Sequence, residues 1–428
     1  MRHFGAGCGV LLACFVGAAC GSPDGSSGAV AASGAGGVSS SGGLAVIAGT
    51  GGGAGTGTSG AGANAGGSNP NGGASGSGGV SGNGGLSDSG GASGSGGSQG
   101  GTSGAVNGGA SQQGPSALPV PPAAANIPKP AGAAANLKVL AWAGFAAAAS
   151  YTFDDSQPSQ FEHWPELKAT GARVTYFITT ANNGIAGYDA TLKEVAASGG
   201  ELGNHTVSHC NYDLTNCASP KPLATIAQEI DGCTDYLKTK LGQPDTLTIA
   251  YPYGDAAYEA DSKSRFFLGR GVGGGLIAPD DKTDPFNLPI VAAGGGEAAG
   301  VFSAHLDDAH SQKKWVIFLF HSLGPTTATW YATVDIGSVT GSIEHAKSLP
   351  DLWLDTMANV GAYWLAAKLI QGAGPIWTWQ LPAHYPKGKY LRVSVEGGSL
   401  KQGDKTLSWD PHGYYEVALD AGALSWSP

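Results

Sequence analysis

The sequence predicts an α/β protein with a mainly parallel sheet or barrel, preceded by a long tail that has no core. Two features of the 428-residue chain carry this prediction. After residue 136, short apolar runs rich in Val, Ile, Phe and Tyr alternate with segments of helical periodicity, the pattern of strand-helix units. Between residues 21 and 114, 37 of the 94 residues are glycine and none is aromatic. Such a stretch buries too little apolar surface to fold.

The expected elements follow from these runs in chain order. Strands are expected where the apolar runs occur, at 147–153, 173–178, 247–251, 315–320 and 376–381. Helices are expected where apolar residues recur three and four apart, at 190–197, 223–241, 301–314 and 352–370. Residues 390–395 then alternate between apolar and polar. Together with 407–409 and 414–419, they predict a small antiparallel β appendage.

The N-terminus has the features of an export signal. Arg2 and His3 precede an apolar stretch at 9–16, and small residues lead to Cys20. This end resembles a bacterial lipobox, which implies that Cys20 carries lipid as the first residue of the mature chain. The alternative is an ordinary secretion signal with incidental cysteines. We expect an exported protein at the cell envelope, with residues 21–135 as a flexible leash.

Charge and hydropathy exclude two classes of partner. The formal net charge is −10, so nucleic acid is not an expected partner. No run of about 18 apolar residues exists, so the lipid on Cys20 is the only membrane attachment that we expect. We expect the protein to be a monomer.

Three cysteines fall in the part expected to fold. Cys233 lies on the apolar face of the helix expected at 223–241 and is predicted to be a buried free thiol. Cys210 and Cys217 flank a short polar segment and are the better candidates for a disulfide, which export would permit.

Polar residues follow two of the expected strands in a pattern that can hold a metal ion. Asp154 and Asp155 come directly after the strand at 147–153, although a solvated turn would also explain adjacent carboxylates. His205 and His209 stand four apart, so on one helical turn both imidazoles would face the same way. Surface histidines are the alternative for this spacing. Two histidines and one carboxylate, with positions left for water, are what a metal-dependent hydrolase requires.

Two further strand ends carry candidate residues. Tyr253 follows the strand at 247–251, and His321 ends the apolar strand at 315–320. A histidine at the tip of a buried strand titrates near neutral pH and can act as an acid or a base. A structural histidine with a hydrogen-bond cap is the alternative.

Taken in order, four motifs resemble the polysaccharide deacetylase family, carbohydrate esterase family 4, over about residues 141–379. The motifs are Thr152-Phe153-Asp154-Asp155, His205-Thr206-Val207-Ser208-His209, Tyr251-Pro252-Tyr253-Gly254 and Phe318-Leu319-Phe320-His321. The resemblance implies a distorted (β/α) barrel. It also implies that Asp155, His205 and His209 bind a divalent metal ion, Zn²⁺ or else Co²⁺. Asp154 would be the general base, His321 the general acid, and the Tyr253 backbone N–H an oxyanion donor.

The chain departs from the family pattern at three places. Ser156 stands where a glycine often follows the Asp pair, and Ala250 stands where an arginine commonly orients the base. Arg270, near the end of another expected strand, is a candidate to supply the missing guanidinium. The Asp of the fourth family motif has only Asp281 and Asp284 as candidates.

The resemblance divides the chain into a signal at 1–20, a linker at 21–135, a catalytic domain at 136–385 and a β-rich segment at 386–428. It implies a hydrolase that removes N- or O-acetyl groups from an acetylated glycan. A non-catalytic carbohydrate-binding surface protein on the same barrel is the alternative. Trp164 and the pair Trp330-Tyr331 are expected to stack on sugar rings, whereas Trp353 and Trp364 are expected in the core.

Overall fold

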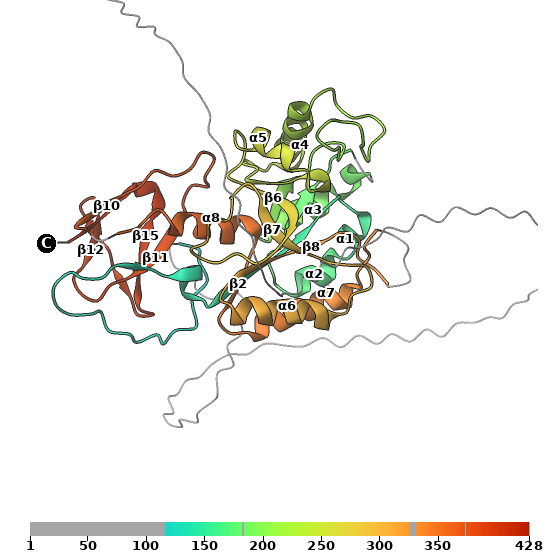
Figure 1. Ribbon diagram of the computed structural model, residues 1–428. Coiled ribbons are helices and arrows are strands. Elements are labelled where there is room, and N and C mark those ends of the chain that lie inside the picture. Colours follow the sequence, from blue (N-terminus) through green and yellow to red (C-terminus); the bar gives the residue numbers. More distant parts are fainter. Residues whose placement is uncertain (1–115, 182–183, 326–330, 373, 428) are drawn as a thin grey trace, which may run out of the picture. The chain divides into compact units, whose positions relative to one another are not determined.

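The computed structural model describes residues 116–181, 184–325, 331–372 and 374–427 (Figure 1). The export signal, Cys20 and the glycine-rich tail therefore lie outside the described residues. Among the helices in the described part, none is long and apolar enough to cross a membrane.

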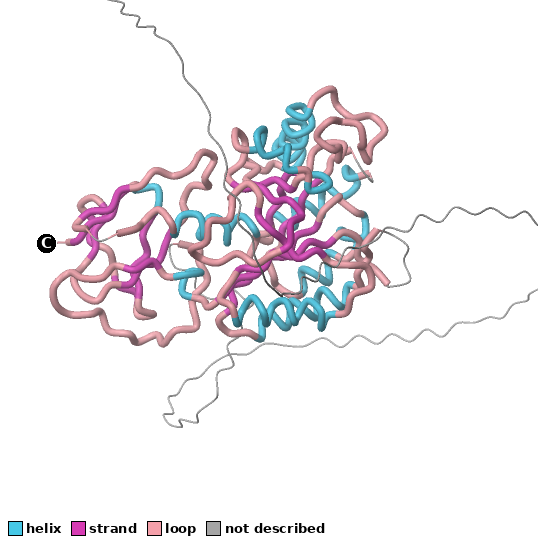
Figure 2. The backbone as a smooth tube through the Cα atoms, in the orientation of Figure 1, coloured by secondary structure: helices cyan, strands magenta, loops and turns pink. Residues whose placement is uncertain are grey.

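One part of the described chain is a parallel barrel with helices around it (Figure 2). Strands β2 to β8 pair in the order β3-β4-β5-β6-β7-β8-β2, and a β2–β3 pairing closes the ring. A further strand, β9, pairs with the first half of β2. The strands are β2 (Ala147–Phe153), β3 (Thr175–Ile178), β4 (Glu201–Asn204), β5 (Thr248–Ala250), β6 (Leu268–Gly274), β7 (Leu288–Ala292), β8 (Trp315–Phe320) and β9 (Leu352–Leu354). The expected α/β barrel is confirmed, and β6 is the strand expected around Arg270. Strands β4, β7 and β9 lie outside the strand ranges expected from the sequence.

The register between β2 and β8 places the candidate residues. Every side chain of both strands is buried, because helices cover the outside and packed side chains fill the inside. Tyr151 of β2 lies opposite Phe318 of β8, and Phe153 lies opposite Phe320. The backbone N–H of Asp154 then donates to the Phe320 carbonyl at 2.9 Å. Asp154 and His321 therefore leave the same edge of the barrel side by side.

The helices cover the barrel and the loops at its rim. They are α1 (Pro158–Glu162), α2 (Trp164–Ala169), α3 (Asp189–Ala197), α4 (Ile226–Leu241), α5 (Glu259–Ser262), α6 (Ala299–Ser311), α7 (Ile336–Ser348) and α8 (Met357–Ala367). The expected helix at 352–370 is wrong in its first turn, where the chain forms β9. The Thr356 hydroxyl accepts from Asn359 N–H at 3.2 Å and caps α8, so the helix starts only after this residue.

The C-terminal segment forms two small antiparallel sheets, which confirms the expected β appendage. One has the order β1-β11-β15-β14 and the other β10-β16-β12-β13. Their strands are β1 (Lys138–Val139), β10 (Ile376–Thr378), β11 (Tyr390–Ser394), β12 (Leu400–Gln402), β13 (Lys405–Thr406), β14 (Trp409–Asp410), β15 (Tyr414–Ala418) and β16 (Ala423–Trp426). The strand expected at 376–381 belongs to this appendage and pairs with β16.

Residues 116–135, which the sequence assigns to the flexible leash, contact the C-terminal segment. The guanidinium of Arg392, only 1% exposed, donates to the carbonyls of Leu118 and Pro119 at 3.4 and 2.7 Å. The Ile127 N–H donates to the Pro411 carbonyl at 2.8 Å. The two carbonyls come from the stretch expected to be linker, and they accept hydrogen bonds from a buried cation of the appendage.

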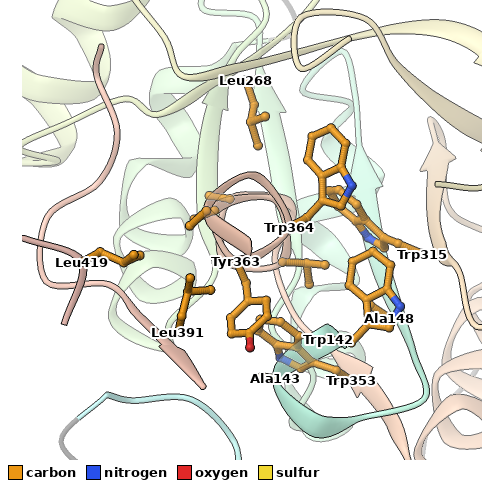
Figure 3. Close-up of a cluster of buried hydrophobic side chains, with 14 of the residues drawn as sticks. Trp142, Ala143, Ala148, Leu268, Trp315, Trp353, Tyr363, Trp364, Leu391 and Leu419 are labelled. Atoms are coloured by element: carbon orange, nitrogen blue, oxygen red, sulfur yellow. The ribbon is translucent and has the colours of Figure 1, made fainter. Parts of the chain in front are cut away.

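One apolar cluster joins the barrel to the appendage (Figure 3). Trp315 of β8 packs edge-on against Trp142 and at a tilt against Trp364 of α8. The Tyr363 hydroxyl donates to the Leu140 carbonyl at 2.7 Å and so ties α8 to the chain leading from β1. Trp353 and Trp364 are each 1% exposed, so the prediction that they pack in the core is confirmed.

Candidate active site

A cavity of about 680 Å³ lies at the carboxyl ends of the barrel strands. Chemistry in parallel α/β barrels is placed at this edge because the strand-to-helix loops converge there. The six candidates Asp154, Asp155, His205, His209, Tyr253 and His321 all line the cavity.

The turn after β2, which carries the two carboxylates, has an unusual backbone conformation. Asp155 and Ser156 both have positive φ, 72° and 53°, a region that favours glycine. The Ser156 hydroxyl accepts from the Thr179 N–H at 2.8 Å, which holds this strained backbone against the end of β3. The family's usual glycine therefore has a backbone reason here, and a hydrogen bond compensates for its replacement by serine.

Three side chains converge on one point of the cavity. Asp155 Oδ1 lies 3.3 Å from His205 Nε2 and 3.2 Å from His209 Nε2. One ligand atom from each of the three residues falls within 4.8 Å of the others. Asp155 Oδ1 is buried and has no hydrogen-bond partner among the described residues, which suits an oxygen that faces a cation.

The donor set fits a divalent metal ion such as zinc. His205 Nδ1 lies 2.8 Å from the Ala250 carbonyl. That carbonyl accepts a hydrogen bond from Nδ1–H, which leaves the lone pair of Nε2 free toward Asp155. Two imidazole nitrogens and one carboxylate oxygen match the ligand set of catalytic zinc sites, which keep a position open.

The two histidines do not share a helical turn, which corrects the geometry expected from their spacing. Strand β4 ends at Asn204, and the following residues are loop. Thr206 and His209 both have positive φ, 67° and 48°, so the chain turns back twice within five residues. A loop with two residues of positive φ, and not a helical turn, thus brings the two imidazole rings together.

The charges of the cluster shift its pKa values in ways that suit metal ligands. Burial tends to raise the pKa of Asp155, but the close contact with His205 and the charges of the histidines around it hold it well below its usual range. Burial lowers the pKa of His209 to about 4, so this ring is neutral at pH 7. Burial also acts to lower the pKa of His205, but the neighbouring carboxylates raise it.

Asp154 is held by Arg270 from a different strand than the family pattern indicates. The two side chains form a buried ion pair, in which the Arg270 guanidinium is fully buried and also lies over the Phe177 ring. Ala250 of β5, at the usual arginine position, is the register partner of Arg270 on β6. The Arg270 guanidinium therefore reaches the Asp154 carboxylate from β6, the neighbour of β5, at the level of Ala250.

Neither candidate for the fourth-motif aspartate lines the cavity. Asp281 accepts from the backbone N–H groups of Ala278 and Thr283, at 2.6 and 3.1 Å. Asp284 accepts from the Phe286 N–H at 2.9 Å. Both carboxylates order the loop between β6 and β7.

His321 faces the cluster from the end of β8. Its Nε2 lies 3.9 Å from Asp155 Oδ2, and its ring meets Tyr331 edge-on with the centroids 4.8 Å apart. Burial lowers the pKa of His321, against the opposing effect of Asp154 and Asp155. Its Nδ1 is buried and has no hydrogen-bond partner in the described part of the chain.

The aromatic residues expected at the rim divide into two groups. Tyr253, 48% exposed and with φ of 56°, lies edge-on to His209 at 4.5 Å between centroids. Tyr331 is 71% exposed and lines the cavity. Trp164 is only 3% exposed and donates to Glu194, so its expected role in stacking on sugar is wrong. Trp330 lies outside the described residues.

The sequence offered no signal for Gln160, which joins the two central loops. Its side-chain amide donates to the Asp154 carbonyl and, at 2.8 Å, to the His321 carbonyl. The residue is fully buried on the one-and-a-half-turn helix α1. A lone glutamine in a short helix has no spacing that would mark such a role.

The family comparison covers the first three of the four motifs. Residues 146–265 match the family model described as polysaccharide deacetylase, which confirms the resemblance inferred from the sequence. No curated protein matches the chain.

Solved structures similar to the chain include three deacetylase-type proteins at low identity. The Xyl-CE4 domain of a multidomain xylanase from the hindgut metagenome of Trinervitermes trinervoides shares 16% identity, with 50% of this chain and 89% of that chain covered and a TM-score of 0.35. The peptidoglycan deacetylase PdaC from Bacillus subtilis shares 16%, with 52% and 91% covered and a TM-score of 0.31. A polysaccharide deacetylase from Bacillus cereus shares 15%, with 49% and 91% covered and a TM-score of 0.32.

Proposed function

We propose that this chain, whose residues 146–265 match the polysaccharide deacetylase family, is a metal-dependent hydrolase that removes acetyl groups from a glycan. One observation carries the proposal. Asp155 Oδ1 lies within 3.3 Å of both His205 Nε2 and His209 Nε2. Around this point, in the same cavity, stand a second carboxylate fixed by an arginine and a histidine at a strand end.

Asp155, His205 and His209 would hold the ion, with zinc favoured and cobalt as a substitute. A divalent ion there supplies Lewis-acid chemistry and makes water acidic enough to react near neutral pH. Arg270 balances the charge of Asp154, whereas the ion-pair contacts of Asp155 in the described part of the chain are with histidines. The carboxylate charge of Asp155 therefore favours the ion.

Asp154 has the position of a general base. Its Oδ1 is engaged by Arg270, while its Oδ2 lies 3.7 Å from His205 Nε2 and faces the same point. The pairing fixes the rotamer and leaves one oxygen to take a proton from the attacking water. His321 stands on the other side of Asp155 and would protonate the departing nitrogen or oxygen of the sugar. The Tyr253 backbone N–H would stabilise the developing oxyanion.

Acetate release from acetylated oligosaccharides tests the assignment of the base. Asp154→Asn should reduce the rate by about 10²–10⁴-fold, the typical contribution of a positioned base. The variant should keep its zinc content and its melting temperature, because the amide can still accept from Arg270. An unchanged rate would contradict this role for Asp154.

The same assay separates the enzyme from a non-catalytic glycan-binding protein. Tight binding of acetylated glycans by the wild-type protein, without release of acetate from any of them, would establish the binding protein. Chelation should abolish acetate release, and zinc or cobalt should restore it.

Location and assembly form a separate part of the proposal. We infer from the sequence that the protein is exported and anchored through lipid on Cys20, and that it acts as a monomer. Cys20→Ser should release the protein from the membrane fraction; a variant that stays bound would place the anchor elsewhere.

A further inference from the structure

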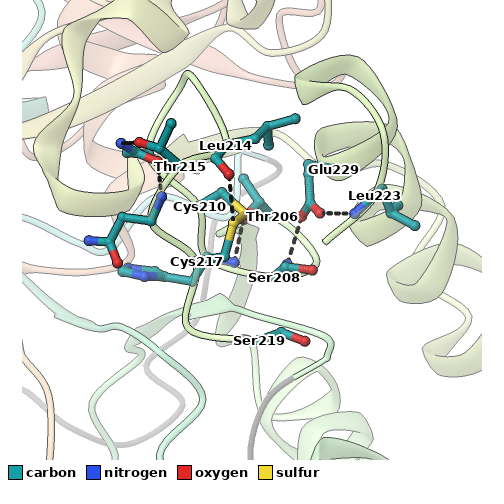
Figure 4. The surroundings of a disulfide bond; sticks show 12 residues. Thr206, Ser208, Cys210, Leu214, Thr215, Cys217, Ser219, Leu223 and Glu229 are labelled. Atoms are coloured by element: carbon teal, nitrogen blue, oxygen red, sulfur yellow. Dashed lines mark hydrogen bonds between the residues drawn. A yellow bond between two sulfur atoms is a disulfide. The ribbon is translucent and has the colours of Figure 1, made fainter. Parts of the chain in front are cut away.

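The loop that carries His209 is closed by a disulfide (Figure 4). Cys210, directly after the candidate ligand, is bonded to Cys217. The Ala218 N–H donates to the His209 carbonyl at 3.1 Å, and the Ser219 N–H donates to the Ser208 carbonyl at 3.1 Å. The disulfide thus keeps Ala218 and Ser219, which follow Cys217, where their backbone N–H groups can donate to the carbonyls of His209 and Ser208.

A buried carboxylate holds the other side of the loop. Glu229, on α4, is fully buried. Its Oε2 accepts from the Ser208 N–H at 2.6 Å, and its Oε1 accepts from the Leu223 N–H at 2.7 Å (Figure 4). Its backbone carbonyl accepts from the Val207 N–H at 3.1 Å. One residue of α4 therefore fixes the two residues that precede His209.

The two histidines depend on different supports. His205 follows β4 directly, and its ring is oriented by the Ala250 carbonyl of the adjacent strand. His209 lies five residues beyond the strand, with a φ of 48° that residues other than glycine avoid. The barrel thus orients the first ring, whereas the conformation of the second depends on the loop contacts.

We propose that the Cys210–Cys217 disulfide and Glu229 form a clamp that presets His209 for the divalent ion, so that metal affinity depends on the disulfide. The inference rests on the proposed metal site. None of the three clamp residues lines the cavity. They therefore act as positioning residues, through the backbone of His209, and touch neither metal nor substrate.

The test is the zinc affinity of the full-length protein, measured at equilibrium against a chromophoric chelator. The double variant Cys210→Ser/Cys217→Ser should bind zinc about 10–100-fold more weakly, the usual effect of losing support behind a metal ligand. Glu229→Gln should weaken binding in the same direction, because its amide group can accept only one of the two N–H groups. Cobalt-loaded variants should show a changed visible spectrum if His209 leaves the coordination sphere.

A matched control lies on the same turn of α4. The Gln228 side chain accepts from the Ala224 N–H at 3.1 Å, which is outside the segment of His209. Gln228→Ala should leave zinc affinity unchanged. Treatment of the wild-type protein with a phosphine reductant should reproduce the loss seen in the double variant, and reoxidation should reverse it. The reductant should not affect the double variant, which keeps the test valid if one of the variants folds poorly.

The outcomes separate the clamp from the metal site itself. If the wild-type protein binds zinc and the folded double variant and Glu229→Gln bind it equally tightly, the clamp is wrong and the metal site stands. If the wild-type protein binds neither zinc nor cobalt, the proposed site fails and the clamp fails with it.

Discussion

At the scale of single residues, the site depends on where each polar atom is held more than on which residues are present. Arg270 illustrates this. It supplies a guanidinium to Asp154 from β6, while the strand position that usually carries the arginine holds Ala250. Two neighbouring parallel strands offer equivalent positions at the same level, so the same ion pair can be built from either of them.

Arg270→Lys tests the need for this planar group. A lysine keeps the charge but cannot make the same fixed fork toward a carboxylate. We expect acetate release to fall by about 10-fold or more, since misplacement of a base lowers the rate steeply. Zinc content should remain unchanged, because Arg270 contacts none of the three proposed ligands. A wild-type rate would show that Asp154 needs no guanidinium fork for orientation.

Cys233 provides a pH-dependent test of burial at the residue scale. It is a free, fully buried cysteine, as predicted, and burial raises the pKa of its thiol to about 12. The unfolded chain ionises near the ordinary cysteine value, about 8.5. Between these values the unfolded state loses its proton and the native state keeps it, so the stability contributed by Cys233 is lost as the pH rises.

Denaturation of the wild-type protein and of Cys233→Ala between pH 8 and pH 10.5 measures this effect. Above about pH 9 the wild-type protein should lose up to about 1.4 kcal/mol more of its unfolding free energy per pH unit than the variant. Tyrosine ionisation is common to both proteins and cancels. A constant difference across this range would show that the thiol reaches water in the native state.

At the scale of elements, short segments at the barrel rim hold the loops that carry the candidate site residues. Helix α1 is only five residues long, yet its Gln160 bridges the loops after β2 and β8. The loop after β4 turns twice through positive φ to bring His209 back to Asp155. Such segments have little periodicity, so the sequence pattern does not reveal their roles. Their roles depend on the strands that they connect.

Gln160→Leu should separate stability from metal binding. The change leaves the Asp154 and His321 carbonyls without their buried donor, at a cost of about 1–3 kcal/mol in unfolding free energy. Acetate release should fall as the two loops lose their common support, while zinc affinity stays near wild type. Gln312→Ala, an exposed change at the end of α6, serves as the control. Equal stability and rate in both variants would contradict the bridging role.

At the scale of the whole molecule, the barrel, the appendage and residues 116–135 share buried contacts. The cluster around Trp315 and Trp364 extends from β8 through α8 to the appendage. Arg392 of the appendage binds carbonyls of Leu118 and Pro119. Arg392 also pairs with Glu416 at 3.2 Å and donates to the Ala143 carbonyl at 2.9 Å, so the two carbonyls supply part of its acceptors. Loss of part of the hydrogen bonds of a buried guanidinium is destabilising.

Truncation tests this dependence. A chain that starts at residue 136 removes two carbonyl acceptors of Arg392 and should be less stable than one that starts at residue 110, by about 3 kcal/mol, since hydrogen bonds to charged groups contribute more than neutral ones. Melting temperatures compare the two chains directly. Equal values would show that residues 116–135 contribute nothing to the fold.

The sequence alone determined the elements with a strong local signal and the residues with distinctive chemistry. Strands β2 and β8 are continuous apolar runs because both of their faces are buried, and they ended where the pattern indicated. The cysteine pair, the buried thiol and the core tryptophans followed from spacing and apolarity. The Asp and His motifs were visible because few residue types can bind a metal ion.

Only the tertiary structure decided how these residues meet. The Asp154–Arg270 pair joins residues 116 positions apart through strand register. The convergence of His205 and His209 depends on backbone angles that no periodicity reports. The packing of residues 116–135 depends on the buried Arg392, which lies 274 positions after Leu118 and 273 after Pro119. Each case rests on contacts between distant segments, and local sequence pattern carries no information about which distant partner is chosen.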